Sequence, residues 1–328
     1  MLLRLKNKCK KLALLLKPKI RLKDNTVVIN KNTWSSFNAS SFNNASINFV
    51  EISDFRQLSA KDYDKIEAIV GGISNPAYLK HLKNLAWFQL ASHGHNGYEN
   101  KALYANSNIT VTNLTNVFSK PMAEYAITAY YLFHCYSFRK KINPNILPSY
   151  VPAMGNDVTV MIYGLGNIGK EVATLCKKQG WTVWGVKRQL SSQPECVDEL
   201  FDFENSIRKL AEVNYVINIL PETKETQAVF NKDFFKHMRN DGIFANLGRA
   251  SAVVDIDLDN AVKNRVIGGA VLDASSDYKF KHPNVIKTGH TSSVSFETKK
   301  FFDDFFTQQL NAYINSGVES LDNIITIK

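Results

Sequence analysis

Three glycines in the middle of the chain constrain the fold more than any other feature. Gly164, Gly166 and Gly169 form the pattern G-x-G-x-x-G between an apolar run, residues 158–163, and an amphipathic run, residues 167–180. A strand, a tight glycine turn and a helix in this order begin a dinucleotide-binding unit, because the turn lets a pyrophosphate approach the free N–H groups at the helix start. We therefore predict a dinucleotide site in a Rossmann domain. The loop residues predicted to contact the dinucleotide are Gly164, Gly166, Asn167, Ile168 and Gly169.

The residues after the next strand indicate which dinucleotide is bound. The run 182–186 predicts that strand, and Lys187 and Arg188 follow it directly. NAD sites usually place an acid at this point, about 20 residues after the glycines, where it accepts hydrogen bonds from the ribose hydroxyls. A Lys-Arg pair instead attracts a 2′-phosphate, which arginine can bind through two hydrogen bonds. We predict a preference for NADP(H), with NAD(H) as the alternative if both side chains are solvated.

The rest of the chain predicts two α/β domains. A length of 328 residues suits about two domains, and 45% hydrophobic with 21% charged residues is typical of a globular protein. Short apolar runs alternate with polar or amphipathic segments, which predicts parallel sheets with helical connections. The predicted strands are 26–30, 47–52, 66–72, 85–91 and 109–113 in a first series, and 158–163, 182–186, 214–220, 242–247, 267–273 and 284–288 in a second.

Three segments outside the strands predict helices. Residues 119–141 are so apolar that a helix there must be covered almost all round, between the domains or against a second subunit. Residues 295–317 predict a C-terminal helix whose aromatic side chains recur at helical spacing, a pattern typical of a core or an interface. Residues 78–83 predict a shorter helix within the first series.

The net charge and the cysteine content restrict which classes of protein this chain can belong to. The net charge is +10, and much of it lies in residues 1–23, whose apolar centre is too short for a signal peptide. We interpret this basic leader as solvated or packed on the rest of the protein. The alternative is that it binds an anionic surface, such as lipid headgroups. No nucleic-acid motif accompanies the charge, no apolar run is long enough to span a bilayer, and the four scattered cysteines suggest neither disulfides nor zinc. We expect a cytoplasmic protein with reduced thiols, no bound metal and no nucleic-acid partner.

Several stretches resemble the D-isomer-specific 2-hydroxyacid dehydrogenase family. The resemblance covers nearly the whole chain from about Thr26, and the motifs occur in the family's order and spacing. They are the nucleotide loop YGLGNIGKEVA, the Pro-x-Thr-x-x-Thr segment LPETKET, the arginine-bearing stretch MRNDGIFANLGRASAVVD, the cofactor-contacting strand GGAVLDA and the histidine-bearing segment NVIKTGH.

The resemblance implies a fold and a division into domains. A Rossmann cofactor domain, residues 121–292, would be inserted into a flavodoxin-like substrate domain formed by residues 24–120 and 293–328. Both would be doubly wound parallel-sheet α/β domains, with the active site in the cleft between them. The family is usually dimeric, so the resemblance implies a homodimer.

The resemblance also implies the roles of individual residues. Arg249 would bind the substrate carboxylate, His290 would donate and accept the proton, and Asp273 would contact the nicotinamide end. These types suit the reduction of a small 2-oxo acid, because a guanidinium stabilises negative charge on the carbonyl oxygen and an imidazole transfers a proton near neutral pH. The backbone of Ser92, His93 and Gly94 would help hold the carboxylate. The further cofactor contacts implied are Leu220, Pro221, Thr226 and Leu247.

Two departures from the family pattern leave the chemistry open. The family normally has a glutamate five residues after the aspartate of the cofactor-contacting strand, which orients the histidine; here that position is Tyr278, and Asp277 lies one residue earlier. Either Asp277 substitutes as a catalytic residue, or His290 lacks a carboxylate partner and is a poorer proton donor. Gly289 stands where the family usually has Pro and predicts a looser backbone before His290. Two hypotheses follow: an NADP(H)-linked oxidoreductase of 2-oxo and D-2-hydroxy acids, or a dinucleotide-sensing binding protein whose chemistry is weakened.

Overall fold

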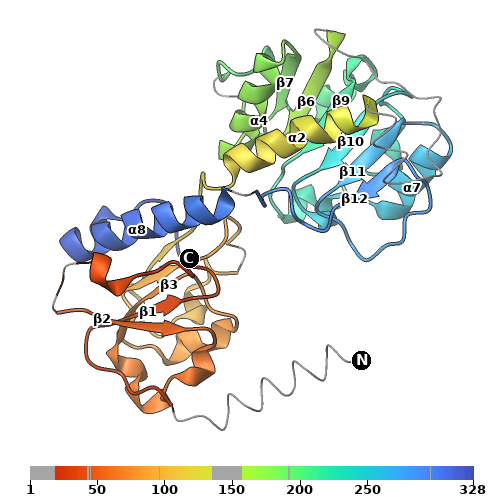
Figure 1. The fold of residues 1–328 in the computed structure, drawn as a ribbon. Helices are drawn as coiled ribbons and strands as arrows, with labels where there is room; N and C mark the ends of the chain where they lie inside the picture. Colours follow the sequence, from red (N-terminus) through yellow and green to blue (C-terminus); the bar gives the residue numbers. More distant parts are fainter. Residues whose placement is uncertain are drawn as a thin grey trace. The chain divides into compact units, whose positions relative to one another are not determined.

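The chain folds into two compact units, one inserted into the other along the sequence. The structure is a computed structural model that describes residues 19–42, 44, 46–95, 97–134, 157–190, 193–295 and 297–328. Unit 1 comprises Met1–Val117 and Phe296–Lys328, and unit 2 comprises Phe118–Ser295 (Figure 1). The sequence predicted these divisions after residues 120 and 292. Each unit is an α/β domain with a fully parallel sheet, as the sequence predicted.

Unit 1 is built on a five-stranded parallel sheet in the order β2-β1-β3-β4-β5. This is the flavodoxin-like order of a doubly wound sheet, which confirms the predicted fold class. All five predicted apolar runs contain a strand, although most strands are shorter than the runs. The strands are β1 (Thr26–Asn30), β2 (Asn48–Ile52), β3 (Ile66–Val70), β4 (Trp87–Gln89) and β5 (Thr110–Thr112).

The connections in the first part of unit 1 are short 3-10 helices. Four of them begin at Asn or Asp residues, Asn38, Asp54, Asn75 and Asn100, whose side chains accept a backbone N–H two residues on. Such local hydrogen bonds favour tight turns over longer helices. The 3-10 helices of unit 1 are η1 (Ala39–Ser41), η2 (Phe55–Gln57), η3 (Ala60–Lys65), η4 (Pro76–His81), which overlaps the helix predicted over 78–83, η5 (Lys101–Leu103) and η10 (Val318–Ser320).

Helix α8 (Thr298–Ser316) covers one face of this sheet (Figure 1). Phe306 of α8 is fully buried, and its ring lies 5.4 Å from that of Trp34. Leu310 is buried one turn later. The other aromatic residues of the predicted stripe, Phe301, Phe302, Phe305 and Tyr313, are half-buried. The stripe therefore contributes one line of side chains to the core of unit 1 and leaves the rest at its margin.

Unit 2 contains a seven-stranded parallel sheet in the order β12-β11-β10-β9-β6-β7-β8. All six predicted strands of the second series form. The seventh strand, β8, has only three residues at the edge of the sheet and none of them is fully buried, so it has no apolar run to predict it. The strands are β6 (Thr159–Tyr163), β7 (Thr182–Val186), β8 (Glu199–Phe201), β9 (Tyr215–Asn218), β10 (Ile243–Asn246), β11 (Gly269–Leu272) and β12 (Val285–Lys287).

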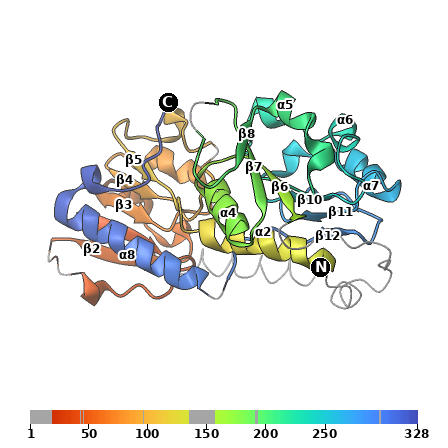
Figure 2. The ribbon, with the colours of Figure 1, turned by 90° about the horizontal axis from the view of Figure 1, so that it is seen from above.

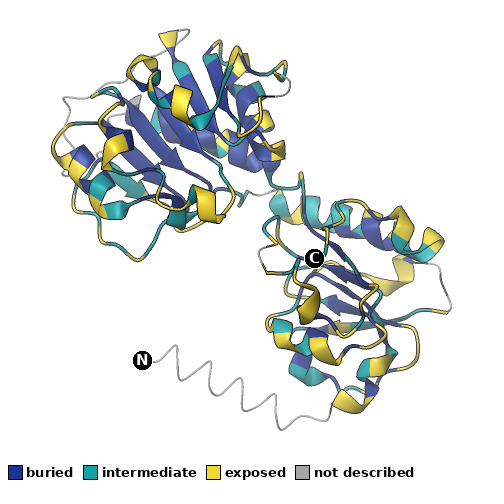
Figure 3. Cartoon of the chain, turned by 180° about the vertical axis from the view of Figure 1, so that it is seen from behind, coloured by how far each residue is buried: buried dark blue, intermediate teal, exposed yellow. Residues whose placement is uncertain are grey.

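Helices cover both faces of the unit 2 sheet, and the sheet itself is buried (Figure 3). Helices α2 and α4 lie side by side on one face, and α5, α6 and α7 belong to the other (Figures 1 and 2). The helices are α2 (Ser119–His134), α4 (Asn167–Lys178), α5 (Phe203–Ile207), α6 (Lys232–Phe235) and α7 (Asp255–Lys263), with 3-10 turns η7 (Leu210–Glu212), η8 (Lys224–Thr226) and η9 (Ala250–Ala252).

Helix α2 is the start of the long apolar helix that the sequence predicts. Its apolar side chains are buried against α4 and the sheet of its own unit, which explains its composition. Tyr130 lies between the rings of Trp181 and Tyr215, and the Tyr215 hydroxyl donates a hydrogen bond to the Ala126 carbonyl at 2.9 Å. The remainder of the predicted helix, residues 135–141, lies outside the described residues.

The end of the predicted basic leader belongs to unit 1. Ile20 pairs with Leu58 in a parallel bridge, and Leu22 is buried in the core. Residues 1–18, which carry most of the leader, lie outside the described residues. Within the described part of the chain, no helix has the length and apolar character needed to cross a membrane.

A buried carboxylate ties this first segment to the body of unit 1. Asp62 is 1% exposed and accepts a hydrogen bond from Arg21 at 2.6 Å. Lys65 lies 3.3 Å from the same carboxylate, and the Leu22 N–H also donates to it. The hydrogen bond from Arg21 outweighs the effect of burial and lowers the pKa of Asp62 from its usual 3.8 to about 2.

We expect Asp62 to make the stability of the protein depend on pH. A lowered pKa means that the ionised carboxylate stabilises the folded state above pH 3.8, and that this contribution is lost as the pH falls towards about 2. The Asp62→Asn variant should therefore be less stable than the wild type at neutral pH, and the difference should shrink in acid. Urea unfolding followed by circular dichroism from about pH 7 down to about pH 2.5 measures it. A constant difference across this range would contradict the assignment.

Candidate functional site

Each of the three glycines in the loop after β6 is explained by a different structural feature. Gly164 has φ +101°, a conformation that side chains disfavour, and a Cβ there would lie 3.0 Å from the Ile219 carbonyl oxygen. A Cβ on Gly169 would lie only 1.9 Å from the Gly164 carbonyl oxygen, so helix α4 packs directly on the turn. A Cβ on Gly166 would meet nothing within 4 Å. Of the three glycines, only Gly166 therefore faces open space. This is the position at which a bound pyrophosphate would come close to the protein backbone.

The start of α4 fits the pyrophosphate of a dinucleotide. Gly166 is the N-cap of α4 and offers no side chain to cap it, and the first helical bond runs from the Lys170 N–H to the Gly166 carbonyl. The N–H groups of Asn167, Ile168 and Gly169 thus have no partner within the helix. Together with the positive end of the helix dipole, they form the donor set that phosphates prefer.

The two basic residues follow β7 at the same edge of the sheet. Lys187 is half-buried and its N–H pairs with the Phe201 carbonyl of β8, whereas Arg188 is exposed. Arg188 lies close enough to Glu225 to influence it: a hydrogen bond with Thr223 is the main cause of the lowered pKa of Glu225, and the positive charge of Arg188 contributes. The β7 end and the loop after β9 therefore approach each other across the glycine turn.

The loop after β9 contains three predicted cofactor residues. The Leu220 N–H donates to the side chain of Asn218 at 2.9 Å. The Thr226 hydroxyl donates to the Pro221 carbonyl at 2.7 Å and accepts the Thr223 N–H at 2.9 Å. In this structure the threonine of the Pro-x-Thr-x-x-Thr motif thus closes its own loop and fixes the path of the backbone.

Arg249 follows β10 by three residues and is half-buried. Its guanidinium Nη1 donates to the Gly248 carbonyl at 2.8 Å, and its own carbonyl accepts a hydrogen bond from the Asn246 side chain at 3.0 Å. Leu247, a further predicted cofactor residue, is buried in the core of unit 2. The backbone of Arg249 is thus fixed, while its side chain retains donors for a ligand.

Asp273 holds the loop that carries His290. Its carboxylate accepts the Thr288 hydroxyl at 2.7 Å, the Thr291 N–H at 2.6 Å and the Ser292 N–H at 3.0 Å, and its carbonyl accepts the His290 N–H at 2.9 Å. Burial of Asp273 opposes ionisation, but the hydrogen bonds from Ser292, Thr288 and Thr291 outweigh it and lower its pKa. In this structure the Asp273 carboxylate, which was predicted to contact the nicotinamide, instead accepts hydrogen bonds from the loop that carries His290.

His290 and Gly289 form an unusual turn. Both are exposed and both have positive φ, +75° for Gly289 and +63° for His290. Proline cannot adopt positive φ, so this chain cannot have the Pro that the family usually places there without a change of backbone. Gly289 therefore specifies a different turn, and the sequence prediction of a merely looser backbone was incomplete.

Asp277 does not contact His290. Among the described residues it is exposed and has no hydrogen bond or ion pair with the imidazole. The loop is held on α7 instead, because Ser276 donates to Asp255 and the Tyr278 hydroxyl donates to Asp259. This geometry lacks the contact that the predicted catalytic role of Asp277 requires.

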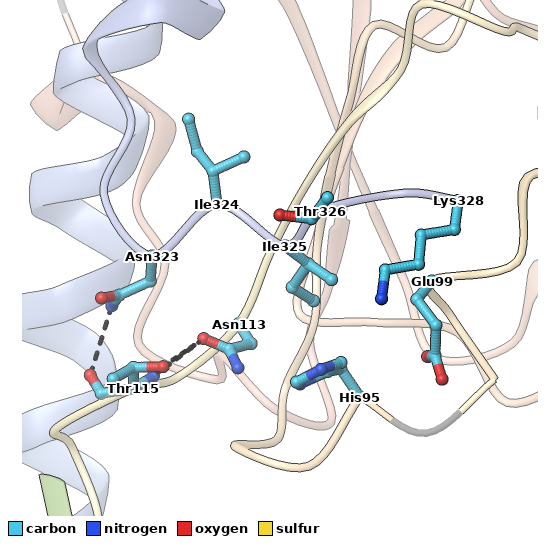
Figure 4. A pocket seen from close by; sticks show the side chains of 9 residues that line it. All are labelled: His95, Glu99, Asn113, Thr115, Asn323, Ile324, Ile325, Thr326 and Lys328. Atoms are coloured by element: carbon cyan, nitrogen blue, oxygen red, sulfur yellow. Dashed lines mark hydrogen bonds between the residues drawn. The ribbon is translucent and has the colours of Figure 1, made fainter. Parts of the chain in front are cut away.

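The predicted carboxylate loop lies in unit 1, after β4. The Ser92 hydroxyl donates to the Gly94 carbonyl at 2.7 Å, and the Asn113 side chain donates to the His93 carbonyl at 2.8 Å. Beside this loop is a mostly polar cavity of about 510 Å³ (Figure 4). Its lining residues are His95, Glu99, Asn113, Thr115, Asn323, Ile324, Ile325, Thr326 and Lys328. Among the described residues, no group of three His, Cys, Asp or Glu side chains could hold a metal ion.

Two functional candidates were missed by the sequence analysis. Asn218 and Asn246 are buried at the last positions of β9 and β10, and their side chains are joined by a hydrogen bond of 2.8 Å. The sequence does carry a signal, because each Asn ends an apolar run, but it does not show that the two strands are neighbours.

These features define a dinucleotide-binding α/β protein with two parallel-sheet domains. Residues 149–292 match the family model for the NAD binding domain of D-isomer specific 2-hydroxyacid dehydrogenases. A D-lactate dehydrogenase of Streptococcus pyogenes serotype M1 is 26% identical over 259 residues, which are 77% of this chain and 74% of that protein.

Solved structures share the fold of the whole chain. A D-isomer specific 2-hydroxyacid dehydrogenase family protein of Aeromonas salmonicida has a TM-score of 0.76 at 22% identity, over 93% of this chain and all of that chain. An NADPH-dependent glyoxylate/hydroxypyruvate reductase of Sinorhizobium meliloti, in complex with NADP and sulfate, has a TM-score of 0.72 at 21% identity, over 92% of this chain and 98% of that chain. The Rossmann unit of the chain is thus similar to the NAD binding domain of D-isomer-specific 2-hydroxyacid dehydrogenases, and the chain shares the two-domain fold of these solved structures.

Two glycine variants should separate folding from cofactor binding. Gly169→Ala places a Cβ against the Gly164 carbonyl and should destabilise the protein by about 1–3 kcal/mol. Gly166→Ala meets no atom within 4 Å and has φ −73°, so stability should stay unchanged while the methyl group obstructs the pyrophosphate and weakens dinucleotide binding at least tenfold. Thermal unfolding and fluorescence titration with NADPH test both. Unchanged NADPH binding by Gly166→Ala would contradict the proposed phosphate site.

Proposed function

We propose that this protein is an NADP(H)-linked oxidoreductase that interconverts a small 2-oxo acid and a D-2-hydroxy acid. The observation that carries the proposal is the common edge of the unit 2 sheet. Because every strand is parallel, the glycine loop after β6, Arg249 after β10 and His290 after β12 all leave the sheet at the same edge. Strands β10 and β12 are separated only by β11, roughly 10 Å in all, so both side chains can reach one small acid.

Each part of the proposed reaction is assigned to a different residue of the chain. The nicotinamide cofactor, when bound, supplies or accepts the hydride. Arg249 pairs with the substrate carboxylate and stabilises negative charge on the carbonyl oxygen. His290 delivers a proton to that oxygen in the direction of reduction and takes it back in the direction of oxidation. The start of α4 holds the pyrophosphate through the N–H groups of the glycine loop.

Unit 1 is the proposed substrate domain. The backbone of Ser92, His93 and Gly94 is proposed to help hold the substrate carboxylate. The mostly polar cavity beside this loop suits a small or polar acid better than a bulky apolar one. A homodimer in the cytoplasm, as expected from the resemblance and the cysteine content, is part of the proposal, and light scattering on the purified protein tests the oligomeric state.

The cofactor preference rests on Lys187 and Arg188. Their positions after β7 place positive charge where an NAD site usually has an acid. The Sinorhizobium meliloti reductase, which has the same fold, was solved with NADP. The family model describes an NAD binding domain, so NAD(H) is the alternative cofactor.

The second candidate function is a dinucleotide-sensing binding protein with weakened chemistry. One observation favours it: Asp277 is exposed and has no bond to His290, and the loop that contains it is held on α7. A histidine without a carboxylate partner transfers protons less efficiently, whereas the phosphate site at α4 is intact.

A cofactor and substrate panel decides between these functions. NADPH and NADH are each tested with small 2-oxo acids, such as glyoxylate and pyruvate, and with bulky ones, by the absorbance of the reduced nicotinamide. We expect turnover with NADPH and a small acid, and a loss of about 10²- to 10⁴-fold in kcat for His290→Asn, because the proton donor is removed. Tight NADPH binding without turnover of any acid would instead establish the sensor.

The phosphate contact is tested by reversing the charge after β7. Lys187→Asp combined with Arg188→Ala removes the attraction for a 2′-phosphate and supplies an acid for the ribose hydroxyls. NADPH affinity should fall by about 10- to 100-fold while NADH affinity changes little or rises. Isothermal titration with both cofactors measures this. Lys177→Ala, which removes one positive charge from a surface ion pair with Asp198 on the same unit, is a control for loss of charge elsewhere on the surface. Equal losses for both cofactors would refute the phosphate clamp.

A further inference from the structure

Two buried asparagines join the ends of three strands at the candidate site. Asn218 is fully buried at the end of β9, and Asn246 is 1% exposed at the end of β10. The Asn218 amide nitrogen donates to the Asn246 side-chain oxygen at 2.8 Å. These two side chains lie directly beneath the segments that carry the proposed cofactor and substrate contacts.

The side chain of Asn246 uses all of its hydrogen-bonding capacity. Its nitrogen donates to the carbonyls of Arg249, at 3.0 Å, and Ala274, at 2.7 Å. Its oxygen accepts from the Gly248 N–H, at 3.2 Å, and from Asn218. An amide has two donor hydrogens and two acceptor sites, so this arrangement admits one orientation and no isosteric replacement.

The packing around this amide leaves little room for an alternative. A Cβ on Gly248 would lie 2.8 Å from the Leu220 carbonyl and 3.0 Å from the Asn218 nitrogen. The turn from β10 to Arg249 is therefore pressed against the end of β9. The Arg249 carbonyl accepts the Asn246 side chain at 3.0 Å and the Ala252 N–H at 3.3 Å, so displacement of the Asn246 side chain removes the shorter of these two hydrogen bonds and loosens the Arg249 backbone.

The same amide reaches the segment that holds His290. Ala274 follows Asp273, whose carboxylate accepts three hydrogen bonds from the Thr288–Ser292 loop. The Asn246 carbonyl also accepts the N–H groups of Asp273 and Ala274, both at 3.1 Å. One residue thus fixes the backbone of Arg249 directly and the base of the His290 loop through β11.

We propose that Asn246 is a positioning residue that sets the distance between the Arg249 guanidinium and the His290 imidazole. This inference rests on the proposed function, in which those two side chains act on one 2-oxo acid. Asn246 touches neither substrate nor cofactor; it acts through the Arg249 carbonyl and the Ala274 carbonyl. Asn218 supports it by accepting the Leu220 N–H while it donates to Asn246.

The first test replaces the amide by an isosteric carboxylate. Asn246→Asp turns a double donor into an acceptor that faces two carbonyls, so Arg249 must shift. We expect kcat/KM for glyoxylate or pyruvate to fall by about 10- to 100-fold, while the Kd for NADPH, which depends on the α4 start, changes less than about threefold. Asn246→Ser, which keeps one donor and no charge, is the second variant if the carboxylate prevents folding.

A matched control lies at the opposite edge of the same sheet. Asn284 is also buried and donates to a backbone carbonyl, that of Gly268, but it precedes β12 instead of following a strand. Asn284→Asp and Asn284→Ser carry the same changes in chemistry. They should lower thermal stability, by less than the Asn246 variants because the Asn284 side chain has fewer hydrogen bonds to lose, but leave kcat/KM for the 2-oxo acid within about threefold of wild type.

A double-mutant cycle and a binding measurement identify the route. In an Arg249→Lys background, Asn246→Asp should cost less further activity than in the wild type, because one of the two groups that it positions is already altered. Affinity for oxamate, an unreactive analogue of a 2-oxo acid, measured by calorimetry in the presence of NADPH, should fall in parallel. Additive losses, or wild-type kinetics and oxamate binding in both Asn246 variants, would overturn the inference while the proposed function stands. A wild-type protein that binds NADPH but reduces no 2-oxo acid would overturn both.

Discussion

The parallel direction of all seven strands of unit 2 is the constraint on which its candidate site depends. Carboxyl ends of parallel strands meet at one edge, so segments that are more than a hundred residues apart, from the glycine loop to the His290 turn, must leave the sheet side by side. The same edge receives the start of α4, where three unpaired N–H groups attract phosphate. The direction of the strands alone thus brings the proposed anion site and the two proposed catalytic side chains to one edge, without any contribution from side-chain contacts. What remains for side chains is to fix the loops.

At this edge the loops are fixed by buried polar groups. Asp273 and Asn246 are 2% and 1% exposed, and every oxygen and nitrogen of their side chains has a partner. A buried polar group left without a partner costs about 1–3 kcal/mol, so alternative loop conformations that break these bonds are disfavoured by that amount. This explains how His290 is kept at φ +63°, which costs a residue with a side chain roughly 1–2 kcal/mol. Hydrogen bonds with fixed geometry select one loop conformation more sharply than apolar contacts do.

The sequence predicted the fold well because both sheets are buried on both faces and their strands are continuous apolar runs. It missed β8, since an edge strand of three partly exposed residues has no such run. It predicted a helix over residues 78–83, where the structure has the 3-10 helix η4, which begins after Asn75. The glycine loop was also predictable, because its pattern is local in the sequence; the backbone itself requires Gly164 and Gly169, and Gly166 leaves space for a ligand. The Asn218–Asn246 pair was not, because its meaning depends on the strand order, which no local pattern contains. The role of Asp277 stayed open for the same reason: its distance along the chain from His290 says nothing about the attachment of its loop to α7.

That attachment bears on how His290 can work. The acids nearest to the Ser276–Tyr278 loop, Asp255 and Asp259, are occupied by Ser276 and by the Tyr278 hydroxyl, and burial together with the charge of Asp259 raises the pKa of Tyr278. The remaining carboxylate of this loop, Asp277, has no hydrogen bond or ion pair with the imidazole among the described residues. What holds His290 in this structure is its backbone: the left-handed turn, which glycine at the preceding position permits, and the Asp273 carboxylate, which holds the residues on either side. In the family pattern a glutamate aims the histidine from outside. In the proposed function the turn itself holds the histidine here, so a change in the turn should alter the proposed proton transfer even when the imidazole is intact.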